Sequence, residues 1–245
     1  LTQEFLPDPN VADSNLMLWL DASDSASMDR GVSLGDLGVP SNENTISFWA
    51  DRSGNGHHAR AMSTMPKYKK SGLNFKPTVQ FSNDTMKVDK SESSFDGWAG
   101  FSLYMVWQTK SNSNWSPLFG KTNSNNTATD ATWYFLARRA DQIPPYYRWQ
   151  INGESSTIAP EINTDYSVNI KSPNILVLDY DGTTAKAWLN GTEVISNSYT
   201  GGLRSTPYPF TLGGAANELG GATIEFSEIL IYKSSLSAER RILLE

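Results

Sequence analysis

The sequence is poor in the residues that most often bind metals or act as nucleophiles. Its 245 residues include no cysteine and two histidines, His57 and His58. Without thiols the chain can form no disulfide bond, thiolate metal site or cysteine nucleophile. The two histidines are adjacent, so on a strand they would point to opposite faces and could not easily bind one ion together. These absences argue against a zinc site or a histidine-based active site.

Positive charge and long apolar runs are also scarce. The chain has 20 Lys and Arg residues against 26 Asp and Glu residues, a formal net charge of −6, and its basic residues are scattered. Binding to phosphates requires a concentrated basic face, and a membrane-spanning helix requires about 20 apolar residues. We therefore expect neither a nucleic-acid partner nor membrane insertion, and a neutral ligand fits this charge distribution better.

Aromatic residues, by contrast, are abundant: 8 Trp, 10 Tyr and 10 Phe. Because such side chains bury large areas, a chain of this length can form the core of one large domain. We predict an extended N-terminal segment over residues 1–15, where Pro7 and Pro9 disfavour helix, and a single domain over residues 16–245. Leu1 is not a natural start, so we expect a monomeric module of a longer protein.

Short β-rich runs separated by turn residues dominate the pattern. The runs ILVLDY, TTAKAWL and TEVIS, between residues 175 and 196, are separated by Asp181-Gly182 and Asn190-Gly191, which favour tight hairpin turns. These runs predict a three-strand antiparallel meander. Further strands are predicted at residues 16–20, 46–50, 78–81, 102–109, 132–139, 146–151, 210–212 and 224–232.

Helical periodicity is confined to the C-terminal end of the chain. The run AERRILLE follows Ser237, which can cap a first turn, and Glu239 suits the positive end of the helix dipole. Many short strands with one short helix are typical of a β-sandwich or barrel. The sequence therefore predicts an all-β fold.

Four stretches resemble laminin-G-like, concanavalin A-like jelly-roll domains, a family found in bacterial polysaccharide-degrading enzymes and surface adhesins. They are LMLWLDASD (16–24), FWADRSGNGHHA (48–59), KPTVQF (76–81), and the meander with the closing EFSEILIYKSSLSAER (225–240). The resemblance implies a two-sheet antiparallel jelly-roll sandwich with a short C-terminal helix, located outside the cell or at its surface. The fold alone does not define a function, because such sandwiches include lectins, hydrolases, lyases and adhesion domains.

The loop DRSGNG at residues 51–56 is a candidate calcium site. Asp51 and Asn55 supply the oxygen ligands that Ca²⁺ prefers, and the two glycines let the loop bend around an ion. Hydrogen bonds from these side chains to the backbone of a tight turn would explain the same residues equally well. Members of the family often carry calcium, so the resemblance favours a structural Ca²⁺ ion at Asp51 and Asn55.

Two patterns bear on catalysis. Glu225 and Glu228 are three residues apart and would face opposite sides of a regular strand, which does not suit the acid pair of a glycoside hydrolase. The run YYRWQ places Tyr146, Arg148 and Gln150 on one strand face, and a polysaccharide lyase could use such groups as base and carboxylate-neutralising partners. We favour a non-catalytic role, with a lyase as the alternative.

The strand at residues 146–151 is also the predicted ligand face. On a regular strand the side chains of Tyr146, Arg148 and Gln150 would emerge about 7 Å apart. Tyr146 would stack on a sugar ring while Arg148 and Gln150 bind its hydroxyls or a carboxylate. Trp115 and Trp98 border loops and could widen this aromatic platform.

These observations predict a non-catalytic, extracellular glycan-binding or adhesion module. The simpler interpretation of residues 146–151 is a solvated outer face without a ligand, with Tyr147 and Trp149 packed in the core. That interpretation would suit a protein-binding or structural spacer domain, including a domain of a viral fibre, which is the second alternative.

Overall fold

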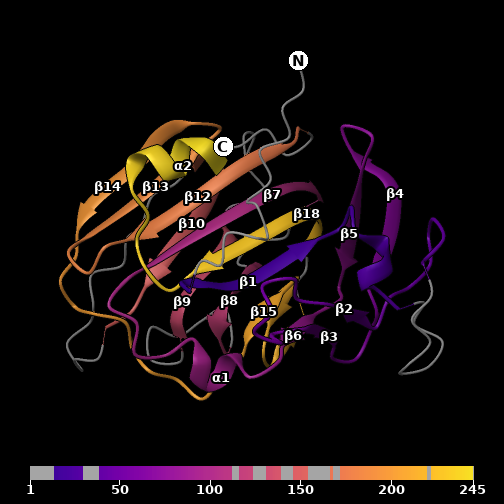
Figure 1. The fold of residues 1–245 in the computed structure, drawn as a ribbon, viewed down its shortest axis with the longest axis horizontal. Helices are drawn as coiled ribbons and strands as arrows, with labels where there is room; N and C mark the ends of the chain where they lie inside the picture. The colour runs from indigo at the N-terminus through magenta and orange to yellow at the C-terminus, as the bar shows by residue number, and fades with distance from the viewer. Residues whose placement is uncertain are drawn as a thin grey trace.

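The computed structural model describes residues 14–29, 39–111, 116–123, 131–138, 146–153, 166–167, 172–219 and 222–244. Within this part of the chain, two antiparallel sheets pack face to face as a jelly-roll sandwich (Figure 1). Most of the predicted N-terminal segment at residues 1–15 lies outside the described residues. The all-β fold and the two-sheet architecture expected from the sequence are confirmed.

The first sheet contains the predicted meander and the strand that closes the chain. It has eight strands, seven of them in the order β14 (Thr192–Ser198), β13 (Thr184–Leu189), β12 (Asn174–Tyr180), β7 (Phe101–Ser111), β18 (Thr223–Tyr232), β5 (Lys76–Ser82) and β4 (Lys67–Leu73). The eighth, β1 (Leu16–Asp21), pairs with the C-terminal half of β18. Strands from both ends of the chain therefore meet on β18.

The second sheet packs against the first and is built mostly from the middle of the chain. Its eight strands run in the order β11 (Tyr166–Ser167), β10 (Tyr146–Ile151), β9 (Ala131–Arg138), β8 (Ser116–Thr122), β15 (Phe210–Leu212), β6 (Met86–Val88), β3 (Ala59–Ala61) and β2 (Phe48–Trp49). A short ribbon of β16 (Gly214–Ala215) and β17 (Glu218–Leu219) forms a third sheet, and η1 (Ser25–Ser27) and α1 (Ser91–Ser94) lie in connections.

Aromatic side chains fill the space between the two sheets. Trp49, Trp107, Trp133 and Trp149 belong to one continuous buried cluster, each exposed by 1% or less. Phe101 of the first sheet stacks on Trp133 of the second, with ring centroids 4.8 Å apart. The abundance of aromatic residues is thus explained chiefly by the core, and the predicted core position of Trp149 is confirmed.

A second apolar cluster lies on the outer face of the first sheet, beneath helix α2 (Ala238–Leu244). It comprises Trp19, Tyr104, Val177, Trp188, Leu230 and Tyr232, and Leu244 packs against it. The backbone N–H of Arg240 donates to Ser237 Oγ at 3.3 Å, so Ser237 caps this helix as predicted. In Figure 1, α2 lies across one side of the sheet and the β4–β5 hairpin lies on the other.

Candidate functional site

The turn between β4 and β5 presents an aromatic side chain to solvent. Leu73 pairs with Lys76, so Asn74 and Phe75 form a two-residue turn. Such turns favour positive φ at both positions, and here φ is 44° at Asn74 and 63° at Phe75. A bulky residue is strained in this region, where glycine is usual. Phe75 nevertheless occupies it with 90% of its surface exposed. A strained, exposed aromatic residue is better explained by binding than by folding.

The strand that leads into this turn is irregular. The pairing register of β4 with β5 shifts between Lys69 and Leu73, which marks a bulge. Gly72 allows the close approach that this bulge requires, because a Cβ atom there would lie 2.1 Å from Thr78 Oγ1. Bulges change the direction of side chains and are common beside binding sites. Here the bulge brings Ser71 and Gly72 to the rim of a pocket.

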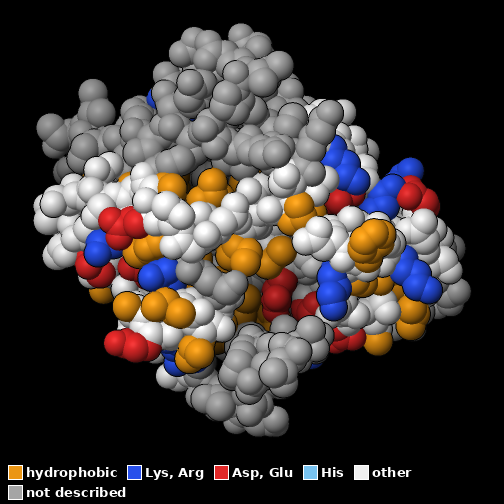
Figure 2. Space-filling model, turned by 90° about the horizontal axis from the view of Figure 1, so that it is seen from above, with side chains coloured by type: hydrophobic (Ala, Val, Ile, Leu, Met, Phe, Trp, Pro, Cys, Tyr) orange, Lys and Arg blue, Asp and Glu red, His pale blue; other side chains and the backbone are white. Residues whose placement is uncertain are grey.

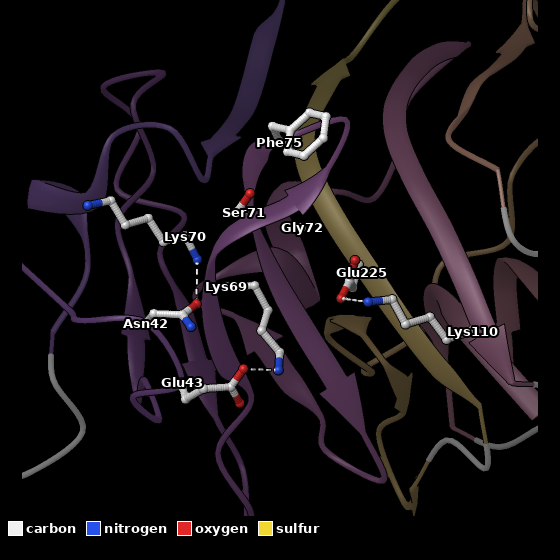
Figure 3. Close-up of a pocket in the computed structure, with 9 residues that line it drawn as sticks. All are labelled: Asn42, Glu43, Lys69, Lys70, Ser71, Gly72, Phe75, Lys110 and Glu225. Atoms are coloured by element: carbon white, nitrogen blue, oxygen red, sulfur yellow. Dashed lines mark hydrogen bonds and ion pairs between the residues drawn. The ribbon is translucent and has the colours of Figure 1, made fainter.

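This pocket has a volume of about 540 Å³ and lies between β4 and the paired strands β7 and β18 (Figure 3). Its lining combines one aromatic ring with many polar groups: Asn42, Glu43, Lys69, Lys70, Ser71, Gly72, Phe75, Lys110 and Glu225. Figure 2 shows acidic side chains in the hollowed centre of this face of the molecule, with hydrophobic and basic side chains beside them.

Glu225 supplies a buried carboxylate to the pocket. Its residue surface is 0% exposed, and Lys110 Nζ lies 2.6 Å from its Oε1 atom. Among the described residues, its other oxygen, Oε2, has no hydrogen-bond partner. A buried carboxylate oxygen without a donor is unfavourable, so native structures rarely keep one without a reason.

Glu225 and Glu228 lie on the same face of the sheet, so the prediction that they face opposite sides is wrong. The register of β18 with β7 shifts between Phe226 and Glu228, which inserts Ser227 as an extra residue. Phe226 and Ile229 therefore both point into the core. A bulge of this kind breaks the alternation on which the sequence argument depended.

Glu228 is partly buried and lies outside the set of residues that line the pocket. Trp19 Nε1 donates to its Oε1 atom at 2.9 Å, and Arg52 lies over the Trp19 ring at 4.3 Å. Burial, together with the nearby Asp21 carboxylate, raises the pKa of Glu228 to about 7, although the Trp19 hydrogen bond and Arg52 act in the opposite direction. Glu228 can therefore exchange a proton near neutral pH.

The predicted ligand face on β10 is buried at Arg148 and Gln150, where exposed side chains were expected. Gln150 is 0% exposed and its amide donates to Asn152 Oδ1 at 2.8 Å, while Arg148 is 9% exposed. These two side chains therefore do not project into solvent as expected. The backbone of Tyr146 pairs with Arg138 and Ser167, and its side chain lies outside the described residues. A ligand role for this strand stays a prediction.

The other two aromatic candidates for the ligand face are Trp98 and Trp115. Trp98 is partly buried against the core, its Nε1 donates to the Ser94 carbonyl at 3.0 Å, and its ring lies 4.9 Å from that of Phe95. Trp115 lies outside the described residues. Phe75 was not predicted from the sequence, because the lysine-rich run before Asn74 does not indicate a strand, and Asn74 was the one local signal for a tight turn.

The candidate calcium loop is organised by hydrogen bonds. The Asp51 carboxylate accepts from the backbone N–H groups of Trp19, Ser53 and His57 and from the Ser53 hydroxyl, at 2.8 to 3.0 Å. The Asn55 amide donates to the Leu16 carbonyl at 2.7 Å. Among the described residues, no three acidic or histidine side chains form a ligand cluster. Calcium at Asp51 and Asn55 stays a prediction.

Comparison with protein families identifies the chain. The model of the Concanavalin A-like lectin/glucanases superfamily, Laminin_G_3, matches residues 82–240. This chain belongs to that family. The matched region includes Lys110 and Glu225 of the pocket, whereas the Phe75 turn precedes it. A comparison with curated protein sequences gave no significant match.

Solved structures with the same fold come from several kinds of protein. The binding domain of Paraclostridial Mosquitocidal Protein 1 aligns with a TM-score of 0.63 at 14% identity over 95% of this chain and 52% of that one, so our chain spans about half its length. Domain 4 of the extracellular GH43 arabinanase AbnA from Geobacillus stearothermophilus, solved with arabinotriose, aligns at 0.58, with 12% identity over 94% and 98%. Botulinum neurotoxin type C, described as interacting with two ganglioside molecules, aligns at 0.59, with 10% identity over 96% and 51%.

No helix of the described residues is long and apolar enough to cross a membrane.

Proposed function

We propose that this chain is an extracellular, non-catalytic module that binds glycans or mediates adhesion through the pocket beside Phe75. The observation that carries the proposal is the exposure of Phe75 in a turn that disfavours its side chain. Sugars present apolar C–H faces on which aromatic rings stack, and nearby polar groups hydrogen-bond their hydroxyls. The pocket combines both kinds of group at one place.

The solved structures of similar fold support this proposal in a general way. The arabinanase domain was solved with a bound oligosaccharide, and the neurotoxin is described as interacting with gangliosides. These properties belong to those proteins, and the low identities transfer only the fold. The case for this chain therefore rests on its own pocket.

A glycan array compared between wild type and Phe75→Ala tests the proposal. We expect wild type to bind at least one glycan and Phe75→Ala to lose about tenfold or more in affinity while keeping its circular dichroism spectrum. Phe75→Tyr, which retains a ring, should keep most of the affinity. Absence of binding to every glycan, or equal binding by Phe75→Ala, would overturn this site as the function of the chain.

Glycoside hydrolysis is a second candidate, and one observation favours it. Glu225 and Glu228 share a face, and their partners on β7, Gln108 and Val106, are two positions apart, which corresponds to about 7 Å. The two carboxyl groups extend from backbone positions at about this spacing, and the raised pKa of Glu228 suits a proton donor for acid–base hydrolysis. Release of reducing ends from a polysaccharide, abolished in Glu228→Gln, would establish this activity.

A further inference from the structure

The charges in the pocket beside Phe75 are balanced within the pocket itself. Lys110 is paired with Glu225, and Lys69 is paired with Glu43. Figure 3 shows the Lys70 side chain pointing away from the other lining residues, while its backbone N–H donates to Asn42 Oδ1 at 2.9 Å. Among the described lining residues, each lysine directed into the pocket therefore already has an acidic partner.

The Lys110–Glu225 pair offers a specific set of hydrogen-bonding groups to a ligand. The Glu225 oxygens have no exposed surface, so the half-exposed Lys110 ammonium is the member of the pair that a ligand can reach, and it can only donate. A sugar hydroxyl can accept from Nζ while Glu225 keeps the charge of Lys110 neutralised. A carboxylate or sulfate on the ligand would be repelled by Glu225 and would compete with it for Lys110.

Phe75, at the rim of the pocket, requires an apolar surface on the ligand. Its ring has no polar atom and is 90% exposed, so its contact with a ligand is with apolar C–H surface. Figure 3 shows the ring on the turn that follows β4, the strand that carries Ser71 and Gly72, whereas Glu225 and Lys110 lie on β18 and β7, with β5 between β4 and β18. A flat sugar ring placed in the pocket would present C–H groups to Phe75 and hydroxyl groups to the ion pair.

We propose that this pocket selects uncharged sugars, with a sugar hydroxyl accepting from Lys110 Nζ, whose charge Glu225 neutralises, and one ring face on Phe75. This inference rests on the proposed glycan-binding function and narrows it to a ligand class. It excludes glycans whose recognised unit is a sialate, a uronate or a sulfated sugar.

Matched oligosaccharides that differ in charge test the selection. Methyl-esterified and free oligogalacturonates of equal length, and arabino- or xylo-oligosaccharides with and without a uronate branch, would be titrated by calorimetry at fixed salt. We expect the neutral member of a pair to bind about tenfold or more tightly. Binding should be lost in Phe75→Gly, a variant at an exposed side chain outside the core, and in Lys110→Gln where that variant folds with Glu225 unpaired. Glu225→Gln, where it folds, should relax the selection against acidic glycans.

A control variant and two opposing outcomes distinguish selection for uncharged sugars from glycan binding in general. Lys87→Gln removes an exposed lysine of β6 in the second sheet, outside the set of residues that line the pocket, and its affinity should equal that of wild type. Tighter binding of acidic glycans that is lost in Phe75→Gly would overturn the selection of uncharged sugars and leave glycan binding at this pocket in place. Absence of binding by neutral and acidic glycans alike would overturn both.

Discussion

Among the residues whose side chains the structure describes, two charged ones have no exposed surface, Lys121 in β8 and Glu225 in β18. Lys121 shares its side of the second sheet with Trp133 and Phe210. Its Nζ donates to the carbonyls of Glu92, Thr206 and Tyr208 at 2.6 to 2.9 Å, and Asp96 lies 3.2 Å away. Glu225 has one ion-pair partner, and its Oε2 has no hydrogen-bond partner among the described residues.

Lys121 and Glu225 differ in how much of their hydrogen-bonding capacity is used within the protein. Three carbonyls and a carboxylate surround the Lys121 ammonium, so all of its donors are used in joining β8 to the segments around α1 and residue 206. Burial lowers the pKa of Lys121, and Asp96 opposes that shift. Glu225 is satisfied only in part and lies beside a pocket, which leaves a place for a ligand. Burial of a charge alone would not have distinguished the two.

Removing Lys121 should have the largest effect on stability. Lys121→Met leaves several buried acceptors without a donor, and we expect the free energy of unfolding to fall by about 3–5 kcal/mol. Denaturant titration followed by circular dichroism measures this change. Lys87→Met, at an exposed position on neighbouring β6, is the control and should stay within about 0.5 kcal/mol of wild type. Similar effects of the two substitutions would contradict a structural role for the buried ammonium.

Glu228 should make stability depend on pH. Its pKa rises from 4.5 to about 7 on folding, so the folded state holds its proton more tightly than the unfolded state. Stability from this group is therefore present below about pH 4.5 and is lost as pH rises to about 7, by an amount on the order of 3 kcal/mol. In Glu228→Gln this loss should disappear, whereas Glu193→Gln, at an exposed position of β14, should keep it. An unchanged pH profile in Glu228→Gln would assign the slope to another group.

Phe75 should be unfavourable for stability while being required for binding. Because glycine adopts positive φ without strain, Phe75→Gly should raise the free energy of unfolding by about 1 kcal/mol, even though it abolishes glycan binding. Thermal and denaturant unfolding measure the gain. As a control, Asn83→Gly changes an exposed residue at φ 60° whose type already tolerates this conformation, so its gain should be smaller. A loss of stability in Phe75→Gly would show that the ring contributes to folding.

The sequence predicted the architecture better than it predicted the pocket. Alternating apolar residues located β7, β12 and β18, and Asn190-Gly191 correctly marked a two-residue turn, since Leu189 pairs with Thr192. These features depend on local pattern alone. The strand β4 was missed because its lysine-rich sequence at the sheet edge lacks apolar alternation.

The features that build the site depend on register, which composition does not reveal. The bulge at Ser227 places Glu225 and Glu228 on one face, and only the pairing with β7 shows it. The sequence predicted that Gln150 faces solvent, because it alternates along β10 with the core residue Trp149. In the folded domain Gln150 is 0% exposed, because other residues cover the outer face of β10 at this position. Alternation predicts which face a side chain occupies. It cannot predict whether another segment covers that face.

Removal of the proposed Ca²⁺ ion from the loop at residues 51–56 should have the smallest effect on stability among these predictions. The four hydrogen bonds to Asp51 use the acceptor positions of both carboxylate oxygens, so the loop is held together by the protein itself. We retain the proposal of a Ca²⁺ ion at Asp51 and Asn55, and we expect it to add less than about 1 kcal/mol. Addition of a chelator should then lower the Tm by about 1–2 °C, and an excess of Ca²⁺ should restore it. Identical melting curves with and without chelator would remove the ion. A fall of about 10 °C would instead show that the ion, and not the hydrogen-bond network, holds this loop.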